Sequence, residues 1–138
     1  MERFLGRYEP NIYAILRIVV GFLFLLHGTQ KLFGFPPSAK PGGSLNAMMA
    51  FAGIIELVAG LMILFGLFAS IAAFIASGQM AVAYFMVHQP QGALPIQNNG
   101  ETAVLFCFIF LYIAARGSGI WSIDALRSGG ERRAGGET

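Results

Sequence analysis

Hydrophobic residues occur in four long runs along the chain, and polar segments containing glycine or proline separate most of these runs. A helix that crosses a bilayer needs about 20 largely apolar residues. The runs predict membrane-spanning helices at residues 12–33, 47–67, 69–87 and 101–116. The last run is short, so its helix either extends toward Ile120 or stands nearly upright. The pattern therefore predicts an all-α fold, an integral membrane four-helix bundle with up-down-up-down topology.

The segments between the runs differ in character. Residues 34–46 contain three prolines and three glycines, which cannot continue a helix. Only residues 66–68 separate the second and third runs, which predicts an antiparallel hairpin. Residues 88–100 are polar, contain proline and lack Lys and Arg. We therefore expect one transmembrane domain over residues 1–127, followed by a disordered cytoplasmic tail over residues 128–138.

Composition supports a lipid environment. Hydrophobic residues make up 56% of the chain and charged residues 12%, against roughly 45–50% and about 25% in soluble domains. The chain has no basic stripe interleaved with exposed aromatics, so the expected partner is the lipid bilayer and not nucleic acid. Because Cys107 is the only cysteine, the chain cannot form an internal disulfide or a C-x-x-C electron relay. Any redox role therefore requires a bound cofactor or a partner protein.

The distribution of cations predicts the orientation. Most of them flank the first and last runs, as Arg3, Arg7, Arg116, Arg127, Arg132 and Arg133. Only Lys31 and Lys40 lie in or beside the long linkers. Cytoplasmic segments are enriched in Lys and Arg, so both termini are expected in the cytoplasm. An even number of spans requires the two termini to share a side, which agrees with this orientation.

Glycines share a helix face with charged residues in the first two predicted helices. One face of the first helix carries Arg17, Gly21, Gly28 and Lys31. One face of the second carries Gly53, Glu56 and Gly60. Small residues at such spacing let helix backbones approach closely in membranes. We therefore expect the two faces to meet, with the four glycines as helix-packing positions.

The ionisable and amide side chains inside the runs are the candidates for function. A charge costs about 2.5–3.5 kcal/mol at the centre of a membrane helix, so each should face protein or water. At 1.5 Å of rise per residue, an Arg17–Glu56 pair is geometrically reasonable, and His27 or Gln79 could also reach Glu56. The sequence predicts a candidate intramembrane polar pocket formed by Arg17, His27, Glu56 and Gln79. A structural role, in which the charges only fix helix register, fits the same residues equally well.

The outer ends of the helices hold a second candidate cluster. Lys31 and Glu101 are expected near the same membrane surface and could form an ion pair, although a lysine extending to interfacial water is the more common arrangement. His27 and His88 lack short ligand spacing, so we predict no metal site. The sequence contains no Ser/His/Asp arrangement, phosphate-binding glycine loop or H-E-x-x-H motif, so we predict no catalytic residues.

Four segments, in order, resemble the DoxX family of small bacterial membrane proteins. They are RIVVGFLFLLHGTQKLFGF (residues 17–35), GIIELVAGLMILFGL (53–67), NNGETAVLF (98–106) and ARGSGIWSID (115–124). The family-like positions are Arg17, Gly21, Gly28, Lys31, Glu56, Gly60, Gly100, Glu101, Gly117, Gly119, Ser122 and Asp124. The hairpin departs from the pattern, because Phe68 and Ala69 stand where relatives often carry Thr-Arg.

The resemblance implies a four-helix bundle in the bacterial inner membrane. It also implies an association with membrane oxidoreductases, including a thiosulfate:quinone oxidoreductase and systems that handle thiol or oxidative stress. The leading hypothesis is a non-catalytic accessory subunit of a quinone- or thiol-linked redox system, with quinone as the candidate cofactor and a membrane or peripheral oxidoreductase as the candidate partner. The alternatives are a small transporter-like unit, which would be a homo-oligomer, and a structural membrane scaffold without ligand.

Overall fold

The computed structural model describes residues 1–38 and 44–135, and within these ranges the chain is all helical, with no strand. The elements are α1 (Glu2–Leu5), η1 (Gly6–Tyr8), α2 (Glu9–Phe33), α3 (Ala47–Phe65), α4 (Ala69–Ala83), η2 (Tyr84–His88), η3 (Gln89–Gln91), α5 (Glu101–Arg116) and α6 (Ile123–Gly135). The segment η2 is a π-helical continuation of α4. The all-α prediction is thus confirmed for the described part of the chain.

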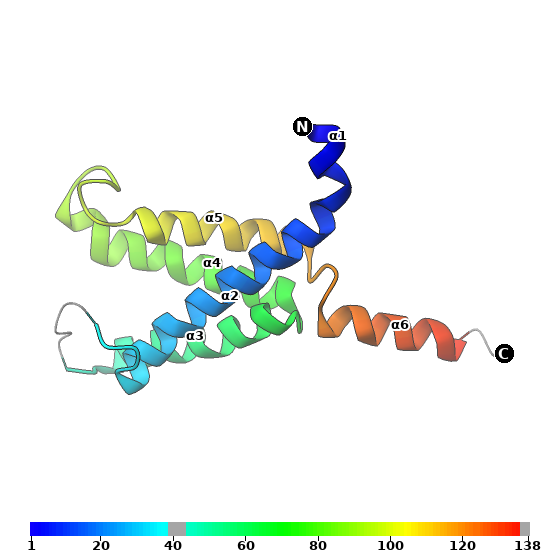
Figure 1. The fold of residues 1–138 in the computed structure, drawn as a ribbon. Helices are drawn as coiled ribbons and strands as arrows, with labels where there is room; N and C mark the ends of the chain where they lie inside the picture. The colour runs from blue at the N-terminus through cyan, green and yellow to red at the C-terminus, as the bar shows by residue number, and fades with distance from the viewer. Residues whose placement is uncertain (39–43, 136–138) are drawn as a thin grey trace.

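Two closely packed pairs, α2 with α3 and α4 with α5, make up the body of the molecule (Figure 1). A tight turn connects α3 to α4, where Gly66 adopts a left-handed conformation (φ 66°) and donates its N–H to the carbonyls of Ile63 and Met62. Glycine suits this position because it has no Cβ to clash in the left-handed region. We call the end of the molecule that holds this turn the hairpin end, and the opposite end, where α3 begins and α4 finishes, the open end.

Glycines set the distance between α2 and α3. A Cβ added at Gly28 would lie 2.5 Å from the backbone nitrogen of Leu57, and one at Gly21 would lie 2.6 Å from that of Leu64. A Cβ at Gly60 would lie 2.7 Å from the backbone nitrogen of Leu25. These distances leave no room for a side chain, so α2 and α3 pack backbone against backbone, antiparallel to each other.

Aromatic rings and small residues fill the core between the pairs. Phe24 of α2 meets Phe110 of α5, with ring centroids 4.7 Å apart, and Phe106 stacks on Phe110 at 5.4 Å. Alanines at positions 72, 73 and 76 form the matching face of α4 and are almost fully buried. Small residues on α4 let α5 approach closely, as in other membrane helix pairs.

The outer surface is strongly apolar. Phe22, Phe74 and Phe108 have 47%, 66% and 65% of their surface exposed, and many Ile, Leu and Val side chains share this property. Three helical stretches, Glu2–Phe33, Ala47–Phe65 and Ala69–Gln91, are long and apolar enough to cross a bilayer. Exposed apolar surface on this scale is stable in lipid and not in water. The fourth predicted span, α5, has 16 residues, a length of about 24 Å.

The expected disordered tail differs from the structure. Residues 123–135 form α6, which projects from the hairpin end (Figure 1). Ser122 accepts a hydrogen bond from the N–H of Ala125 and so caps the start of this helix. The cap and Asp124 in the first turn favour the start of this helix. Residues 136–138 lie outside the described part of the chain.

Candidate functional site

A buried polar cluster joins α2, α3 and α4 near the middle of α3. Lys31 of α2 forms an ion pair with Oε1 of Glu56 on α3. Gln79 of α4 donates its Nε2 to the same oxygen at 2.9 Å and to the carbonyl of Ala52 at 3.3 Å. Glu56 is 1% exposed. The Glu56 carboxylate thus accepts hydrogen bonds from side chains of two other helices, which links the α2/α3 pair to α4.

The glycines bring this cluster together. Lys31 follows Gly28 by one helical turn, and Glu56 follows Gly53 in the same way. Gly28 packs against the backbone of Gly53, Glu56 and Leu57, and Gly53 packs against the side chains of Lys31 and Leu32. Lys31 and Glu56 are therefore level with each other's glycines across the antiparallel interface, and a helical side chain that leans toward its own N-terminus brings the ammonium to the carboxylate.

An apolar groove lies beside the cluster, between α3 and α4 at the open end. It encloses a cavity of about 320 Å³, within the range typical of small-molecule sites. Its walls are mostly apolar, and two polar side chains, Lys31 and Gln79, line it as well. The apolar members are Met48, Met49, Phe51, Ala52, Ile55, Ile75, Val82, Ala83, Met86 and Val87. The sequence did not predict this groove, because the apolar residues that line it look like ordinary lipid-facing residues of a membrane helix.

Two acceptors of the cluster have no donor. Oε2 of Glu56 and Oε1 of Gln79 are buried and find no hydrogen-bond partner among the described residues. A buried acceptor left without a donor costs about 1–3 kcal/mol. The cluster therefore keeps two acceptors without donors in its interior.

Of the three side chains considered as partners of Glu56, Gln79 reaches it, whereas Arg17 does not join this cluster. Its guanidinium lies at the hairpin end and is fully buried. Nη1 donates to the carbonyls of Ile63 and Leu64 at 2.7 and 2.9 Å. Nη2 donates to the carbonyls of Ile120 and Trp121, at 3.3 and 2.7 Å. The planar fork of arginine therefore ties the end of α3 to the segment before α6.

The expected Lys31–Glu101 pair is also replaced, because Lys31 pairs with Glu56. The side chain of Glu101 is exposed at the start of α5. His27 is exposed and packs edge-on against Phe106, with ring centroids 5.8 Å apart. Of the four residues predicted to form the polar pocket, the structure joins Glu56 and Gln79 by a hydrogen bond and places Arg17 elsewhere.

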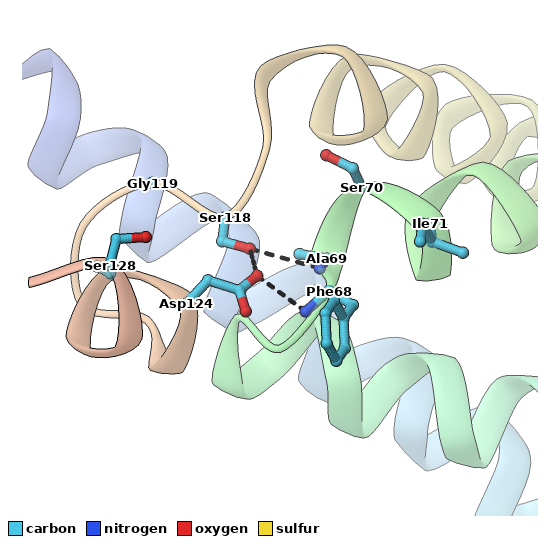
Figure 2. A pocket seen from close by; sticks show the side chains of 9 residues that line it. Phe68, Ala69, Ser70, Ile71, Ser118, Gly119, Asp124 and Ser128 are labelled. Carbon is cyan, nitrogen blue, oxygen red and sulfur yellow. Dashed lines mark hydrogen bonds between the residues drawn. The ribbon is translucent and has the colours of Figure 1, made fainter. Parts of the chain in front are cut away.

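Side chains at the hairpin end close the start of α4. Figure 2 shows Ser118 and Asp124, from the segment after α5, directed toward Phe68 and Ala69. Asp124 accepts from the N–H of Phe68 at 2.8 Å, and Ser118 accepts from that of Ala69 at 3.4 Å. Ser118 also donates to Asp124 at 2.6 Å. The first amides of a helix lack internal partners, and here another segment of the chain supplies them.

A cavity of about 370 Å³ at this end is lined in part by Ser70, Ser118, Asp124 and Ser128. The amides of Phe68 and Ala69, which could otherwise bind an anion, are already bonded to Asp124 and Ser118. We therefore assign this cluster a structural role and treat the α3/α4 groove with the polar cluster beside it as the candidate functional site.

The segment before α5 is organised around Asn98, which sequence analysis did not single out. Asn98 is 1% exposed and donates to the carbonyl of Gly92 at 3.0 Å. Its Oδ1 accepts from the N–H of Gly100 at 2.9 Å. His88 contacts the Asn98 carbonyl at 3.1 Å and stacks on Tyr84. His88 is thus part of this loop's framework.

The chain resembles curated proteins over most of its length. A protein of Haemophilus influenzae, named only "Uncharacterized protein", is 43% identical over 125 residues, covering 87% of this chain and 93% of that protein. "Uncharacterized membrane protein Rv3486" of Mycobacterium tuberculosis is 29% identical, covering 88% of this chain and 85% of that protein. "Putative oxidoreductase CatD" of Bacillus subtilis is 26% identical, with 80% and 82% covered. No solved structure matches the chain.

The family comparison covers most of the apolar part of the chain. The DoxX family model matches residues 12–89, which include most of α2, all of α3 and α4, and therefore every residue of the Lys31–Glu56–Gln79 cluster. The resemblance found in the sequence is confirmed. The apolar surface, the three helices able to cross a bilayer and this match together show that the chain is a membrane protein of the DoxX family.

Proposed function

We propose that the protein is a non-catalytic accessory subunit of a membrane redox system linked to quinones or thiols. The observation that carries the proposal is the buried Lys31–Glu56–Gln79 cluster beside the apolar α3/α4 groove, which Lys31 and Gln79 line. A buried charge is costly in a membrane, so it is the first candidate for a functional site there. An apolar groove with a few polar groups at its base suits a hydrophobic redox carrier with a polar head, such as a quinone.

The name of one relative also supports a redox role. CatD of Bacillus subtilis carries an oxidoreductase name and aligns with 80% of this chain. Within the described residues, no three His, Cys, Asp or Glu side chains group as metal ligands, and Cys107 is the only cysteine. Redox chemistry would therefore be supplied by a partner oxidoreductase or by a bound carrier.

The proposal includes the topology. The helices α2, α3, α4 and α5 form an up-down-up-down bundle in the inner membrane of a bacterium, with α5 standing nearly upright. Both termini lie in the cytoplasm, because Arg3, Arg7, Arg116 and Arg127 flank the bundle at the hairpin end. The groove then opens near the outer half of the membrane.

The experiment is gentle affinity purification from native membranes, with mass spectrometry of co-purifying proteins and extraction of bound quinone. We expect a specific oxidoreductase or stoichiometric quinone with the wild-type protein, and loss of the quinone with Glu56→Gln. Glu101→Gln is the matched control, because Glu101 is an exposed carboxylate outside the cluster. Recovery of the wild-type chain alone, without quinone, would contradict the proposal and favour a transporter-like oligomer or a scaffold.

A further inference from the structure

We propose that the N-terminal arm, formed by α1 and η1 (residues 2–8), is an amphipathic segment that lies at the membrane surface and binds the phosphate groups of anionic phospholipids. This surface is at the hairpin end, away from the Lys31–Glu56–Gln79 cluster, and is independent of the accessory role proposed above. Its position beyond a membrane span, its exposed apolar face and two arginines without a carboxylate partner support the proposal.

The arm lies outside the hydrocarbon core of the membrane. The helix that follows it, α2, has 25 residues and a length of about 37 Å, more than the roughly 30 Å of hydrocarbon in a bilayer. In the first turn of α2, Glu9 pairs with Arg116, the last residue of α5, and both side chains are partly exposed. The arm precedes this polar level, and Figure 1 shows it leaving the side of the bundle at the hairpin end. Lipid headgroups occupy this level.

One side of the arm is apolar and exposed. Every residue of the arm is exposed, and Phe4 has 60% of its surface free. Exposed apolar residues recur at every third or fourth position and continue along α2, as Met1, Phe4, Leu5, Tyr8, Ile12, Ile15 and Val19. A helical segment with such a face and with arginines on its polar side lies in the membrane interface. Because the stripe continues the lipid-facing surface of α2, lipid is the occupant that fits it.

The charges of the arm favour an anionic surface. The arm carries two cations, Arg3 and Arg7, and one acid, Glu2. Within the part of the chain that the structure describes, neither arginine has a carboxylate partner, whereas Arg116 is paired with Glu9. The arm therefore presents positive charge without a counter-charge at the level of the lipid phosphates. Each arginine near an anionic lipid surface strengthens binding about fivefold.

Aromatic rings hold Arg7 at the edge of the apolar face. Its guanidinium carbon lies 5.2 Å from the ring centroid of Phe4 and 4.8 Å from that of Tyr8. Among the described residues, the N–H groups of this guanidinium have no hydrogen-bond acceptor, so they are available to bind a phosphate in bidentate geometry. Aromatic side chains favour the membrane–water interface. Phe4 and Tyr8 would therefore keep the guanidinium at the depth of the phosphates.

The test compares the full-length protein in nanodiscs of phosphatidylglycerol, which is anionic, and of phosphatidylcholine, which is not. Amide hydrogen exchange over residues 4–9 is measured, because a helical segment held at the membrane surface opens less often than one extending into water. We expect exchange at least tenfold slower in phosphatidylglycerol, since two arginines act together. High salt should remove most of this difference, because it screens exposed charges.

Variants with the same change of charge assign the effect to the arm. Arg7→Gln should reduce the difference in exchange between the two lipids about fivefold, and Arg3→Gln/Arg7→Gln should abolish it. Arg127→Gln is the matched control, because Arg127 is a half-exposed arginine of α6, at the same end of the molecule but outside the arm. This control should keep the full difference of the wild type.

Three results would overturn the proposal. Equal exchange in the two lipids would show that the arm does not recognise headgroup charge. A difference that Arg127→Gln reduces as much as Arg7→Gln does would show a response to the net charge of the protein and not a site on the arm. Fast exchange in both lipids would show that the arm extends into water, where a partner protein and not lipid could cover its apolar face.

Discussion

Lys31 of α2 and Glu56 of α3 form an ion pair in the interior of the molecule, and each follows by one turn a glycine of the close α2/α3 contact. The register that buries the pair is set by Gly28 and Gly53. Close packing leaves the carboxylate 1% exposed, and Gln79 donates a second hydrogen bond to the oxygen that Lys31 pairs with. The pair therefore couples the packing of two helices to the polar side chains that line the groove.

Removing one member of this pair should cost more than removing both. Lys31→Met leaves the buried Glu56 carboxylate without its counter-charge, and we expect a loss of about 3 kcal/mol in the free energy of unfolding. The double variant Lys31→Met/Glu56→Gln should recover much of that loss. Thermal unfolding of the single and double variants in detergent micelles measures this coupling. Losses that simply add would show that the two side chains act independently.

Alanine at Gly28 should force α2 and α3 apart. Its Cβ would meet the backbone of Leu57 at 2.5 Å and the Gly53 carbonyl at 2.9 Å, and backbone atoms of two packed helices cannot move aside cheaply. Overpacking of this kind costs about 1–3 kcal/mol.

Gly78→Ala is the matched control, because nothing lies within 4 Å of a Cβ at that helical position. Removal of glycine from a helix interior should leave the free energy of unfolding unchanged or raise it by up to about 1 kcal/mol. The comparison is made by thermal unfolding of both variants. Equal stability of Gly28→Ala and Gly78→Ala would contradict the close packing of α2 and α3.

The apolar runs, and the polar segments with glycine or proline between them, predicted the positions of the helices well. The expected helix at residues 12–33 corresponds to α2, Glu9–Phe33, and the one at residues 101–116 to α5, Glu101–Arg116. The expected third helix, at residues 69–87, is α-helical only to Ala83 and continues as a π-helical segment. Hydropathy carries this information because lipid requires every spanning backbone to satisfy its own hydrogen bonds.

The partners of the charges were harder to predict. The sequence offered the Glu56 carboxylate as a partner for Arg17, yet the Arg17 guanidinium donates to four backbone carbonyls. Carbonyls are present at every residue, so no side-chain pattern identifies them as partners. Trp121, in the segment that Arg17 binds, adopts a left-handed conformation (φ 53°). Local propensity does not favour this conformation for tryptophan, so tertiary contacts set it.

Arg17→Lys should loosen the segment between α5 and α6. A lysine ammonium keeps the charge but lacks the planar fork that binds Ile63 and Leu64 with one nitrogen and Trp121 with the other. We expect at least tenfold faster amide hydrogen exchange over residues 118–126. Arg127→Lys serves as the control, since Arg127 is about half exposed and pairs only loosely with Asp124. Unchanged exchange in Arg17→Lys would show that charge alone suffices.

Ser118→Ala should weaken the cap on α4. The variant removes the acceptor for the Ala69 N–H and the donor that orients Asp124, so we expect a loss of about 1 kcal/mol in the free energy of unfolding. Ser128→Ala is the control, because Ser128 lines the same cavity (Figure 2) without a role in the cap. Chemical unfolding in detergent compares the two variants, and identical stabilities would argue against the cap.

A cysteine in the α3/α4 groove should distinguish a lipid-side site from an aqueous path. In a Cys107→Ala background, Ala52→Cys places a thiol on the groove wall. We expect reaction with membrane-permeant N-ethylmaleimide and at least tenfold slower reaction with a membrane-impermeant sulfonate thiol reagent, because the rim of the groove is apolar and faces lipid. Ser44→Cys, at an exposed position before α3, should react with both reagents. Equal reactivity of Ala52→Cys toward both would place water in the groove, and the transporter-like alternative would then account better for the buried carboxylate than a site for a lipid-soluble redox carrier.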